Sequence, residues 1–140
     1  MEKIKIAAIQ MPTVADKMEN VRTVKTYLEK IKDENPDFVI LPEMFCCPYQ
    51  TENFPIYAEK EGGPVWQQLS GYAKQYGIYL IGGSMPEKDA EGNVYNTSYI
   101  FDRDGKKIGK HRKVHLFDID VKGGQTFKES DTLTAGDSDT

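Results

Sequence analysis

Residues 38–49 read FVILPEMFCCPY, and this stretch decides how the chain is expected to fold. Residues 38–41 are apolar throughout, as in strands that are buried on both faces of a parallel sheet. Glu43 follows this run after a single proline. A carboxylate at the carboxyl end of such a strand is either a surface cap or a group in the crevice where open α/β sheets bind ligands. Its position alone leaves both interpretations open.

The segments around this strand predict a β-α-β unit. Residues 3–10 (KIKIAAIQ) predict a first strand, and residues 37–41 predict the second. Between them, Asp16 and Glu19 have the spacing of a helix-capping pair, and Asn35-Pro36 ends the helical pattern. The apolar positions of this helix recur at steps of three and four residues: Met18, Val21, Val24, Leu28 and Ile31. Parallel strands joined by a right-handed crossover are therefore expected.

The rest of the chain predicts a mixed sheet. A second helix begins at Pro64 and is capped by Gly77, and residues 78–83 form a third buried strand. Residues 94–102 alternate in polarity and turn back at Asp104-Gly105 into residues 106–113, which predicts a β-hairpin. Parallel units followed by antiparallel strands give an α/β fold with a mixed sheet.

Two stretches look like loops, residues 48–63 and everything after Val114. Two helices can cover only one face of a sheet whose apolar side chains alternate onto both. We therefore expect something beyond Thr140, or another chain, to cover the second face.

Composition limits the classes of function. The 140 residues are 39% hydrophobic and 29% charged, a normal balance for one soluble globular domain. The formal net charge of −4 argues against general binding to nucleic acid or to anionic membranes. No apolar run approaches the length of a membrane-spanning helix, and the amino end lacks the pattern of a secretory signal. A cytoplasmic protein is the expectation.

The basic segment KKIGKHRKVH (106–115) has several interpretations. It could be a solvated strand edge, where lysines discourage unwanted strand pairing. Nucleic-acid binding is less favoured because no aromatic residues are interleaved. One lysine could instead stabilise a developing oxyanion, although spacing does not say which. His111 and His115 stand four residues apart, but no third metal ligand stands out, so no metal site is predicted.

Two short motifs invite a chemical interpretation that we do not favour. Gly82-Gly83-Ser84 follows a strand like a phosphate loop, but no helix follows it, so a tight turn is expected. Cys46 and Cys47 stand three and four residues after Glu43. Close neighbours on an extended segment often point apart, and we therefore interpret both cysteines as free packing or loop thiols.

LPEMF (41–45), followed by HRKVHLFD (111–118), resembles the nitrilase superfamily of carbon–nitrogen hydrolases. The similarity runs from IKIAAIQ to TLTAGDS and is strongest to the omega-amidase branch. The resemblance implies an α-β-β-α sandwich, usually dimerised. Residues 1–140 would be the amino-terminal part, about the first half, of one such domain.

The resemblance also assigns roles to residues of this sequence. Glu43 matches the general base, and Lys113 matches the lysine that stabilises the tetrahedral intermediate. Glu129 matches a second glutamate near the lysine and the substrate amide. Tyr49 and Phe117 fall where related amidases line the substrate pocket. No metal or organic cofactor is implied.

The sequence departs from the family pattern at the nucleophile. The family's cysteine lies downstream of the segment matching TLTAGDS, beyond Thr140, and neither Cys46 nor Cys47 matches it. We expect the intact protein, as a homodimer or higher homo-oligomer, to hydrolyse small linear amides through a cysteine thioester, and residues 1–140 alone to be inactive. The alternatives are a non-catalytic fragment or interaction module, or a related hydrolase of carbamoyl amides or nitriles.

Overall fold

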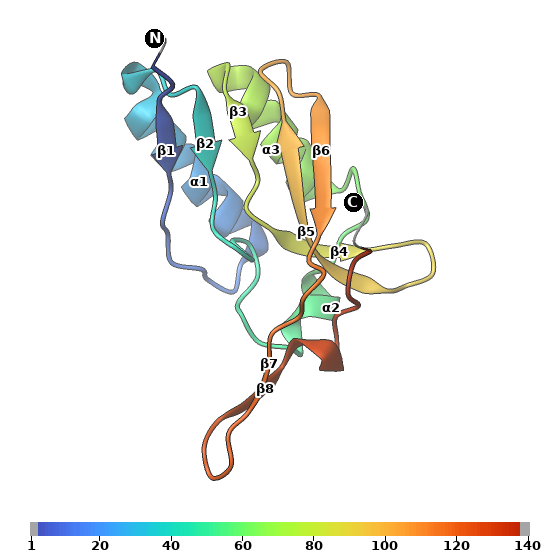
Figure 1. The fold of residues 1–140 in the computed structure, drawn as a ribbon. Helices are drawn as coiled ribbons and strands as arrows, with labels where there is room; N and C mark the ends of the chain where they lie inside the picture. Colours follow the sequence, from blue (N-terminus) through green and yellow to red (C-terminus); the bar gives the residue numbers. More distant parts are fainter. Residues whose placement is uncertain (1–2, 138–140) are drawn as a thin grey trace.

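The computed structural model describes residues 3–137 as a mixed sheet with helices packed on one face (Figure 1). The sheet has six strands, and five of them follow the order β1-β2-β3-β5-β4. β3 and β4 pair with the same edge of the long strand β5, and β6 pairs with its opposite edge. β1, β2 and β3 are parallel, whereas β5 is antiparallel to β3, β4 and β6. The strands are β1 (Ile6–Ala8), β2 (Phe38–Ile40), β3 (Tyr79–Ile81), β4 (Met85–Lys88), β5 (Val94–Phe101) and β6 (Lys107–Arg112). The predicted parallel unit, hairpin and mixed α/β class are confirmed.

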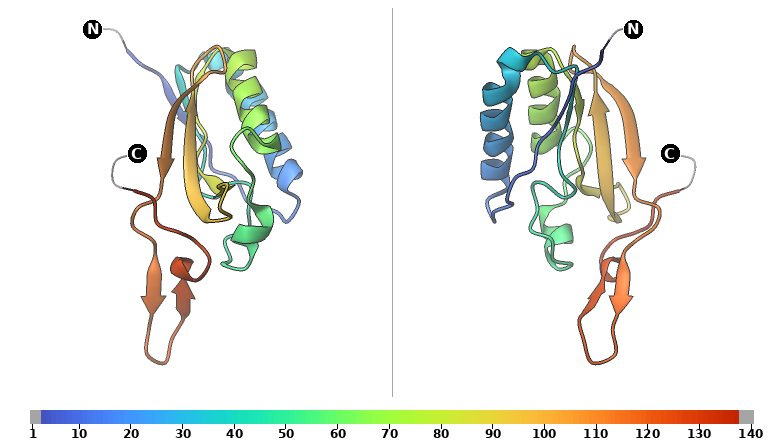
Figure 2. Two further views of the ribbon diagram at one scale, coloured as in Figure 1. Left: turned by 90° about the vertical axis from the view of Figure 1, so that its right-hand side faces the viewer. Right: turned by 60° about the vertical axis from the view of Figure 1, so that its left-hand side comes forward.

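Two long helices form the layer beside this sheet (Figure 2). They are α1 (Lys17–Ile31), continued by the 3-10 turn η1 (Lys32–Glu34), and α3 (Pro64–Tyr76). The Asp16 carboxylate caps α1 by accepting from the Glu19 amide at 2.9 Å, as the sequence predicts. Gly77 ends α3 in the left-handed conformation with φ 62°, which is also the predicted cap.

The main core lies between the helices and the sheet. Val24 of α1 and Leu69 of α3 are fully buried against strand residues such as Val39 and Leu80. Leu69 also packs over the bend that follows β3, where a Cβ at Gly82 would stand 3.0 Å from the Leu69 Cδ1 atom. This packing ties the helical layer to the part of the sheet where the chain changes direction.

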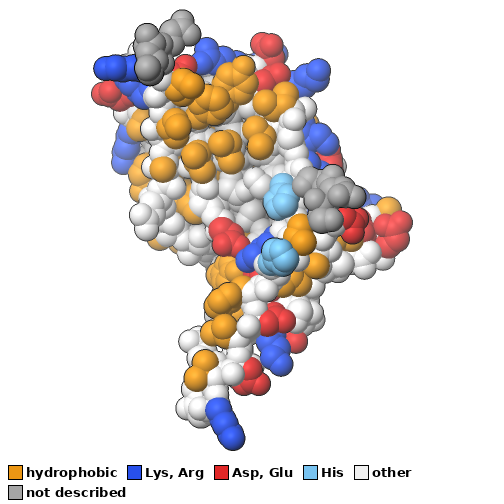
Figure 3. Space-filling view, in the orientation of Figure 1, with side chains coloured by type: hydrophobic (Ala, Val, Ile, Leu, Met, Phe, Trp, Pro, Cys, Tyr) orange, Lys and Arg blue, Asp and Glu red, His pale blue; other side chains and the backbone are white. Residues whose placement is uncertain are grey.

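The opposite face of the sheet is uncovered, as predicted. Hydrophobic side chains gather on it (Figure 3), and Ile6 and Ile108 are 61% and 54% exposed. Burying such side chains is worth about 25 cal/mol for each Å² removed from water, so an apolar face of this kind favours a covering partner. Whether a segment beyond Thr140 covers this face, as the sequence analysis expects, lies outside the described residues.

Two predictions of irregular structure are wrong. Residues 48–63 contain a short helix, α2 (Asn53–Tyr57), and residues after Val114 form a hairpin of β7 (Asp118–Asp120) and β8 (Thr126–Lys128) followed by the 3-10 turn η2 (Glu129–Asp131). The hairpin projects from the body of the molecule (Figure 2). A second, smaller core joins these segments and consists of Met44, Cys47, Phe54, Val94 and Leu133.

The β4 strand was also missing from the prediction. Its sequence, MPEK, contains a proline and shows no clear alternation. β4 pairs with β5 alone in the sheet, and a proline is tolerated in such an edge strand because its missing amide need not bond a neighbour.

Truncating Leu69 tests how far the helical layer depends on its core. Leu69→Ala removes a fully buried side chain, so the free energy of unfolding should fall by about 2–5 kcal/mol. Ile56→Ala changes a side chain that is 74% exposed and should alter it by no more than about 0.5 kcal/mol. Urea titration measures both, and equal losses for the two variants would contradict the packing described.

Candidate active site

Glu43 stands in a turn directly beyond the carboxyl end of β2. Ser84 holds this turn from the neighbouring bend: its hydroxyl accepts from the Met44 amide at 3.0 Å, and its own amide donates to the Pro42 carbonyl at 3.2 Å. Met44 has a positive φ of 49°, which is uncommon for a residue other than glycine. The turn is therefore fixed on both sides of Glu43, while the Glu43 side chain stays 51% exposed.

Gly83 lets the two turns approach each other. It has a φ of 56°, and a Cβ built there would lie 2.0 Å from the Pro42 carbonyl oxygen. Any other residue would push the bend away from Glu43. The Gly82-Gly83-Ser84 segment is thus a tight turn, as predicted. It packs against the turn that carries the Glu43 carboxylate and supports it.

Lys113 comes directly after β6 and points at Glu43. Its amide donates to the Asn96 carbonyl on β5 at 2.8 Å, and its carbonyl accepts from the Gly136 amide at 2.9 Å. Its Nζ atom lies 3.0 Å from Glu43 Oε1. Residues 70 positions apart in the chain therefore meet at one end of the sheet.

Glu129 completes an ionic triad with Glu43 and Lys113. Its side chain is fully buried, and its Oε2 atom lies 3.0 Å from Lys113 Nζ. Glu129 also accepts from the Phe117 amide at 2.6 Å and from the Tyr49 hydroxyl. A buried carboxylate is costly unless it is paired and hydrogen-bonded, and this one is both.

The triad sets the charge of Lys113. Partial burial alone would lower the pKa of the Lys113 ammonium, but the hydrogen bonds and negative charges of Glu129 and Glu43 outweigh it and raise the pKa above the usual value for a lysine. Lys113 is thus a firmly charged group whose side chain is still 27% exposed.

Aromatic side chains lie on the other side of Glu129. Tyr49 stacks on Phe127 with ring centroids 5.5 Å apart, and Phe117 lies 6.2 Å from Phe127. Burial and the bond to Glu129 raise the pKa of Tyr49, which keeps its hydroxyl protonated as a donor. A cavity of about 240 Å³ here is lined by Tyr49, Phe117, Ile119, Gln125 and Phe127. All five residues predicted as site residues are therefore brought into one region.

A groove opens on the Glu43 side of the triad. Its volume is about 350 Å³, and it lies over the uncovered face of the sheet. It is lined by Ile40, Leu41, Glu43, Ile81, Gly83, Ser84, Asn96, Ser98, His111 and Lys113. The carboxylate and the ammonium thus stand at the edge of an apolar floor, where electrostatic interactions with a bound molecule are strengthened by the lower polarity.

Two residues of the site were missed by sequence analysis. Asn96, on β5, is buried and donates from Nδ2 to Glu43 Oε1 at 2.8 Å, and Ser84 supports the turn described above. The signal for Asn96 was a polar residue in the alternating strand 94–102, which indicates neither its burial nor its partner. Ser84 belongs to the predicted Gly82-Gly83-Ser84 turn, but nothing in the sequence indicates that it supports the turn of Glu43.

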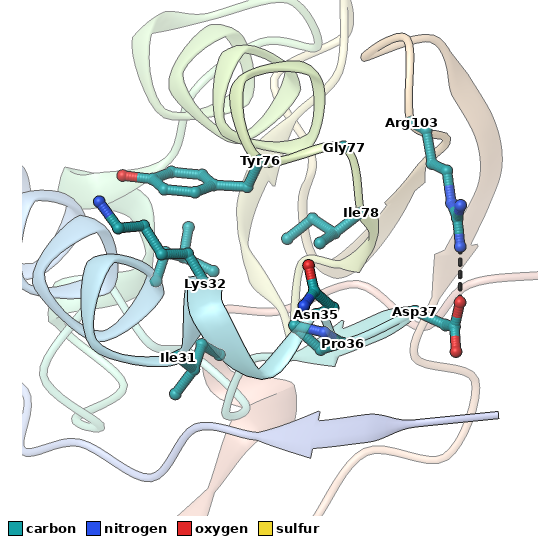
Figure 4. Close-up of a pocket in the computed structure, with 10 residues that line it drawn as sticks. Ile31, Lys32, Asn35, Pro36, Asp37, Tyr76, Gly77, Ile78 and Arg103 are labelled. Carbon is teal, nitrogen blue, oxygen red and sulfur yellow. Dashed lines mark hydrogen bonds and ion pairs between the residues drawn. The ribbon is translucent and has the colours of Figure 1, made fainter. Parts of the chain in front are cut away.

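A third cavity, of about 180 Å³, lies at the opposite end of the sheet, between the carboxyl ends of α1 and α3 (Figure 4). Its charged groups already have partners: Arg103 bonds Asp37 at 2.7 Å, and Lys32 bonds Glu29 at 2.9 Å. Asp37 directly precedes β2, so this cavity faces the amino ends of the parallel strands, whereas ligands in open α/β sheets bind at the carboxyl ends. It is a weaker candidate than the triad.

The two cysteines are packing thiols, as predicted. Cys46 and Cys47 are free and almost fully buried, and burial raises the pKa of each to about 12. A thiol with so high a pKa is a poor nucleophile near neutral pH. Neither is suited to attack a substrate in the groove.

Neither a metal centre nor a membrane span emerges from the described part of the chain. Within residues 3–137, no group of three or more His, Cys, Asp and Glu side chains is arranged to hold a metal ion. No helix in the same range has both the length and the apolar character needed to cross a bilayer.

A buried ionic cluster braces β6 beside the triad. The Glu87 carboxylate on β4 is 2% exposed and accepts from Arg112, Lys110 and Thr97 at 2.6–3.1 Å. Burial alone would raise the pKa of Glu87, but these donors lower it from 4.5 to about 2. Because Arg112 directly precedes Lys113, the cluster fixes the end of the strand that presents the ammonium.

The comparisons with known proteins agree on one family. The family model described as carbon–nitrogen hydrolase matches residues 5–140. Omega-amidase NIT3 of Saccharomyces cerevisiae is 45% identical over 147 residues, and omega-amidase NIT2 of Homo sapiens is 46% identical over 138 residues. Each alignment covers 99% of this chain and 50% of the relative. The chain therefore spans about half the length of the curated relatives it matches.

Solved structures share the fold. Nit3 of Saccharomyces cerevisiae, a member of branch 10 of the nitrilase superfamily, has a TM-score of 0.84 at 40% identity, covering 98% of this chain and 50% of that one. A carbon–nitrogen hydrolase of Helicobacter pylori G27 has a TM-score of 0.82 at 24% identity, covering 96% and 45%. At this lower identity the likeness concerns the fold alone.

The Glu87 cluster predicts a specific dependence of stability on pH. Its pKa is lower in the folded state, so its contribution is complete above about pH 4.5 and is lost as the pH falls towards about 2. Glu87→Gln should lower the free energy of unfolding by roughly 1–3 kcal/mol at pH 7 and flatten this part of the pH profile. Urea titrations from pH 7 to 3 measure it, with Glu91→Gln on the surface as control; parallel profiles for wild type and Glu87→Gln would contradict the prediction.

Proposed function

Since this chain belongs to the carbon–nitrogen hydrolase family, we propose that the protein containing it hydrolyses the carbon–nitrogen bond of small linear amides and releases ammonia. The observation that carries the proposal is the position of Lys113 Nζ, 3.0 Å from both Glu43 Oε1 and Glu129 Oε2 at the edge of an open groove. A base and a cation held at this distance are what acyl transfer from an amide requires.

The first half of the proposed reaction forms a thioester. Glu43 takes the proton of a cysteine thiol, and the sulfur attacks the amide carbonyl carbon. The carbonyl oxygen becomes an oxyanion, which the Lys113 ammonium stabilises. An ammonium has three N–H donors, so Lys113 can bond both glutamates and still donate one hydrogen bond to the substrate. The carbon–nitrogen bond then breaks, and the proton held by Glu43 passes to the leaving ammonia.

The second half regenerates the enzyme. Glu43 removes a proton from water, which attacks the thioester carbonyl, and the thiolate leaves and recovers its proton. The thiol in this scheme comes from a part of the protein outside residues 1–140, because Cys46 and Cys47 are buried among apolar side chains. Residues 1–140 are thus the amino-terminal part of one catalytic domain and would be inactive alone.

Glu129 serves Lys113 in this proposal. It is the fully buried partner, whereas Glu43 is half exposed, so Glu129 holds the ammonium in place while the Glu43 carboxylate gains and loses a proton. When Glu43 is neutral, Lys113 is still paired by one carboxylate and stays charged. The two glutamates therefore have different tasks because their surroundings differ.

We propose short dicarboxylate monoamides, including amides of 2-oxo acids, as the substrate class. The support is the identity of 45–47% to proteins named omega-amidases. The groove of about 350 Å³ beside Glu43 and Lys113 has room for a small molecule, and Tyr49 and Phe117, which lie beyond Glu129, are proposed to complete the substrate pocket. A cytoplasmic homodimer is the proposed working form.

Ammonia release by the full-length protein tests the proposal. A panel of a dicarboxylate monoamide, a carbamoyl amide and an aliphatic nitrile separates the reaction classes. We expect the monoamide to give the highest kcat/KM. A protein that releases no ammonia from any of them is a non-catalytic protein, and a preference for the nitrile or carbamoyl compound would replace the proposed substrate class.

Substitution of the triad tests its roles in the same assay. Glu43→Gln and Lys113→Ala should each lower kcat/KM about 100- to 10,000-fold, since they remove the base and the oxyanion cation. Glu91→Gln and Lys25→Ala, which change exposed residues of the same types, serve as controls and should match wild type. Turnover near that of wild type in either triad variant would refute the assignment.

A further inference from the structure

We infer that Asn96 is a positioning residue that anchors the Glu43 side chain and the Lys113 backbone, and that leaves Glu43 Oε2 as the oxygen that exchanges the proton. The inference rests on the proposed function and adds a residue to it. Asn96 lies on β5, which together with β3 separates the strand that ends before Glu43 from the strand that ends before Lys113. No other feature of the sequence distinguishes it from the polar residues around it.

Asn96 holds Glu43 through its side chain. Its Nδ2 atom donates to Glu43 Oε1 at 2.8 Å, and the residue is only 3% exposed. A buried amide donor has few alternative partners, so leaving this bond unmade would cost the desolvation of the amide. The bond is therefore a strong constraint on a carboxylate that is otherwise half open to solvent.

Asn96 holds Lys113 through its main chain. Its carbonyl oxygen accepts from the Lys113 amide at 2.8 Å, just beyond the last residue of β6. The register of β5 and β6, in which Thr97 pairs with Arg112, places these groups opposite each other. Asn96 thus fixes both the backbone of Lys113 and the side chain of Glu43.

The two anchors act on the same carboxylate oxygen. Asn96 Nδ2 and Lys113 Nζ lie 2.8 and 3.0 Å from Glu43 Oε1. Within residues 3–137, the donors that reach this carboxylate both bond Oε1 rather than Oε2. Rotation of the carboxylate would break both bonds at once, so Oε2 stays directed away from them and is the oxygen proposed to take the thiol proton.

Asn96 is an uncharged member of the groups that face the Glu43 carboxylate. The other groups that face this carboxylate differ in sign. Lys113 supplies a positive charge, Glu129 supplies a negative one, Tyr49 presents a neutral hydroxyl, and His111 lines the same groove. Asn96 is the neutral donor of the set, so its removal changes hydrogen bonding without changing the net charge.

Three variants of the full-length protein test the inference. Asn96→Ala deletes the donor. Asn96→Asp keeps the size and shape of the side chain but replaces the donor with an acceptor. Asn93→Ala removes an exposed amide that bonds Asp89 instead, and is the matched control. Ammonia release is measured over a range of substrate concentrations, so that kcat and KM are obtained for each.

Loss of the donor should act on the chemical step. In Asn96→Ala, kcat should fall about 10- to 100-fold, the equivalent of one hydrogen bond to a charged group, with little change in KM. Asn96→Asp should lose at least as much, because it removes the donor and places a second carboxylate against Glu43. Wild-type values for either variant would overturn the inference.

A crystal structure of Asn96→Ala separates this inference from the proposed function. We expect Glu43 to leave its present rotamer and the distance from Oε1 to Lys113 Nζ to exceed about 3.5 Å. If the Glu43 carboxylate of Asn96→Ala kept its position, the inference would be overturned even though the wild-type enzyme released ammonia. Conversely, if wild type and Asn93→Ala released no ammonia from any substrate, the proposed function would fail while the crystal structure still decided the role of Asn96.

Discussion

One ammonium held between two carboxylates is the interaction on which the site depends. Glu129 is completely buried, and a carboxylate in that position is stable only with a cation and hydrogen-bond donors around it. Lys113 supplies the charge, and the Phe117 amide and Tyr49 hydroxyl supply the remaining donors. Lys113 in turn reaches out to Glu43, which faces the groove. The buried half of the triad thus provides the rigidity, and the exposed half is free for chemistry.

The fold brings these groups together by ending several strands at the same place. Glu43 follows β2, Lys113 follows β6, and Glu129 begins the turn after β8. Each is fixed by backbone hydrogen bonds or close packing that do not involve the charged groups themselves: Ser84 and Gly83 for the turn of Glu43, and the Asn96 carbonyl for Lys113. The mutual attraction of the triad therefore adds to a geometry that the backbone already imposes.

The sequence was informative where a physical pattern is local. The apolar period of α1, its Asp16 cap, the Gly77 cap and the Asp104-Gly105 turn each depend on residues within a few positions, and all of them are found in the structure. The pairing of Glu43 with Lys113 was expected from the resemblance of two motifs to a known family. The two residues stand 70 positions apart, and the chain between them carries no local signal for such a contact.

The missed features depend on tertiary contacts. β4 contains a proline that only an edge position tolerates, and α2 contains Pro55 and is stabilised by the burial of Phe54. The β7–β8 hairpin is short, and each strand contains a single apolar residue, so its alternation extends over only three residues. Asn96 is recognisable only once its strand is known to lie between the two charged groups. For α2 and Asn96 the deciding partners are distant in sequence, whereas β4 and the β7–β8 hairpin pair with nearby strands but lack a clear sequence pattern.

The most direct test of the triad is the titration of the Lys113 ammonium, followed by NMR through its side-chain nitrogen. If two carboxylates hold this group, its pKa lies above the usual value for a lysine and falls when Glu129 is replaced by glutamine. A pKa of Lys113 below the usual value in the wild-type protein would contradict the account. A pKa that stays the same when Glu129 is replaced by glutamine would contradict it as well.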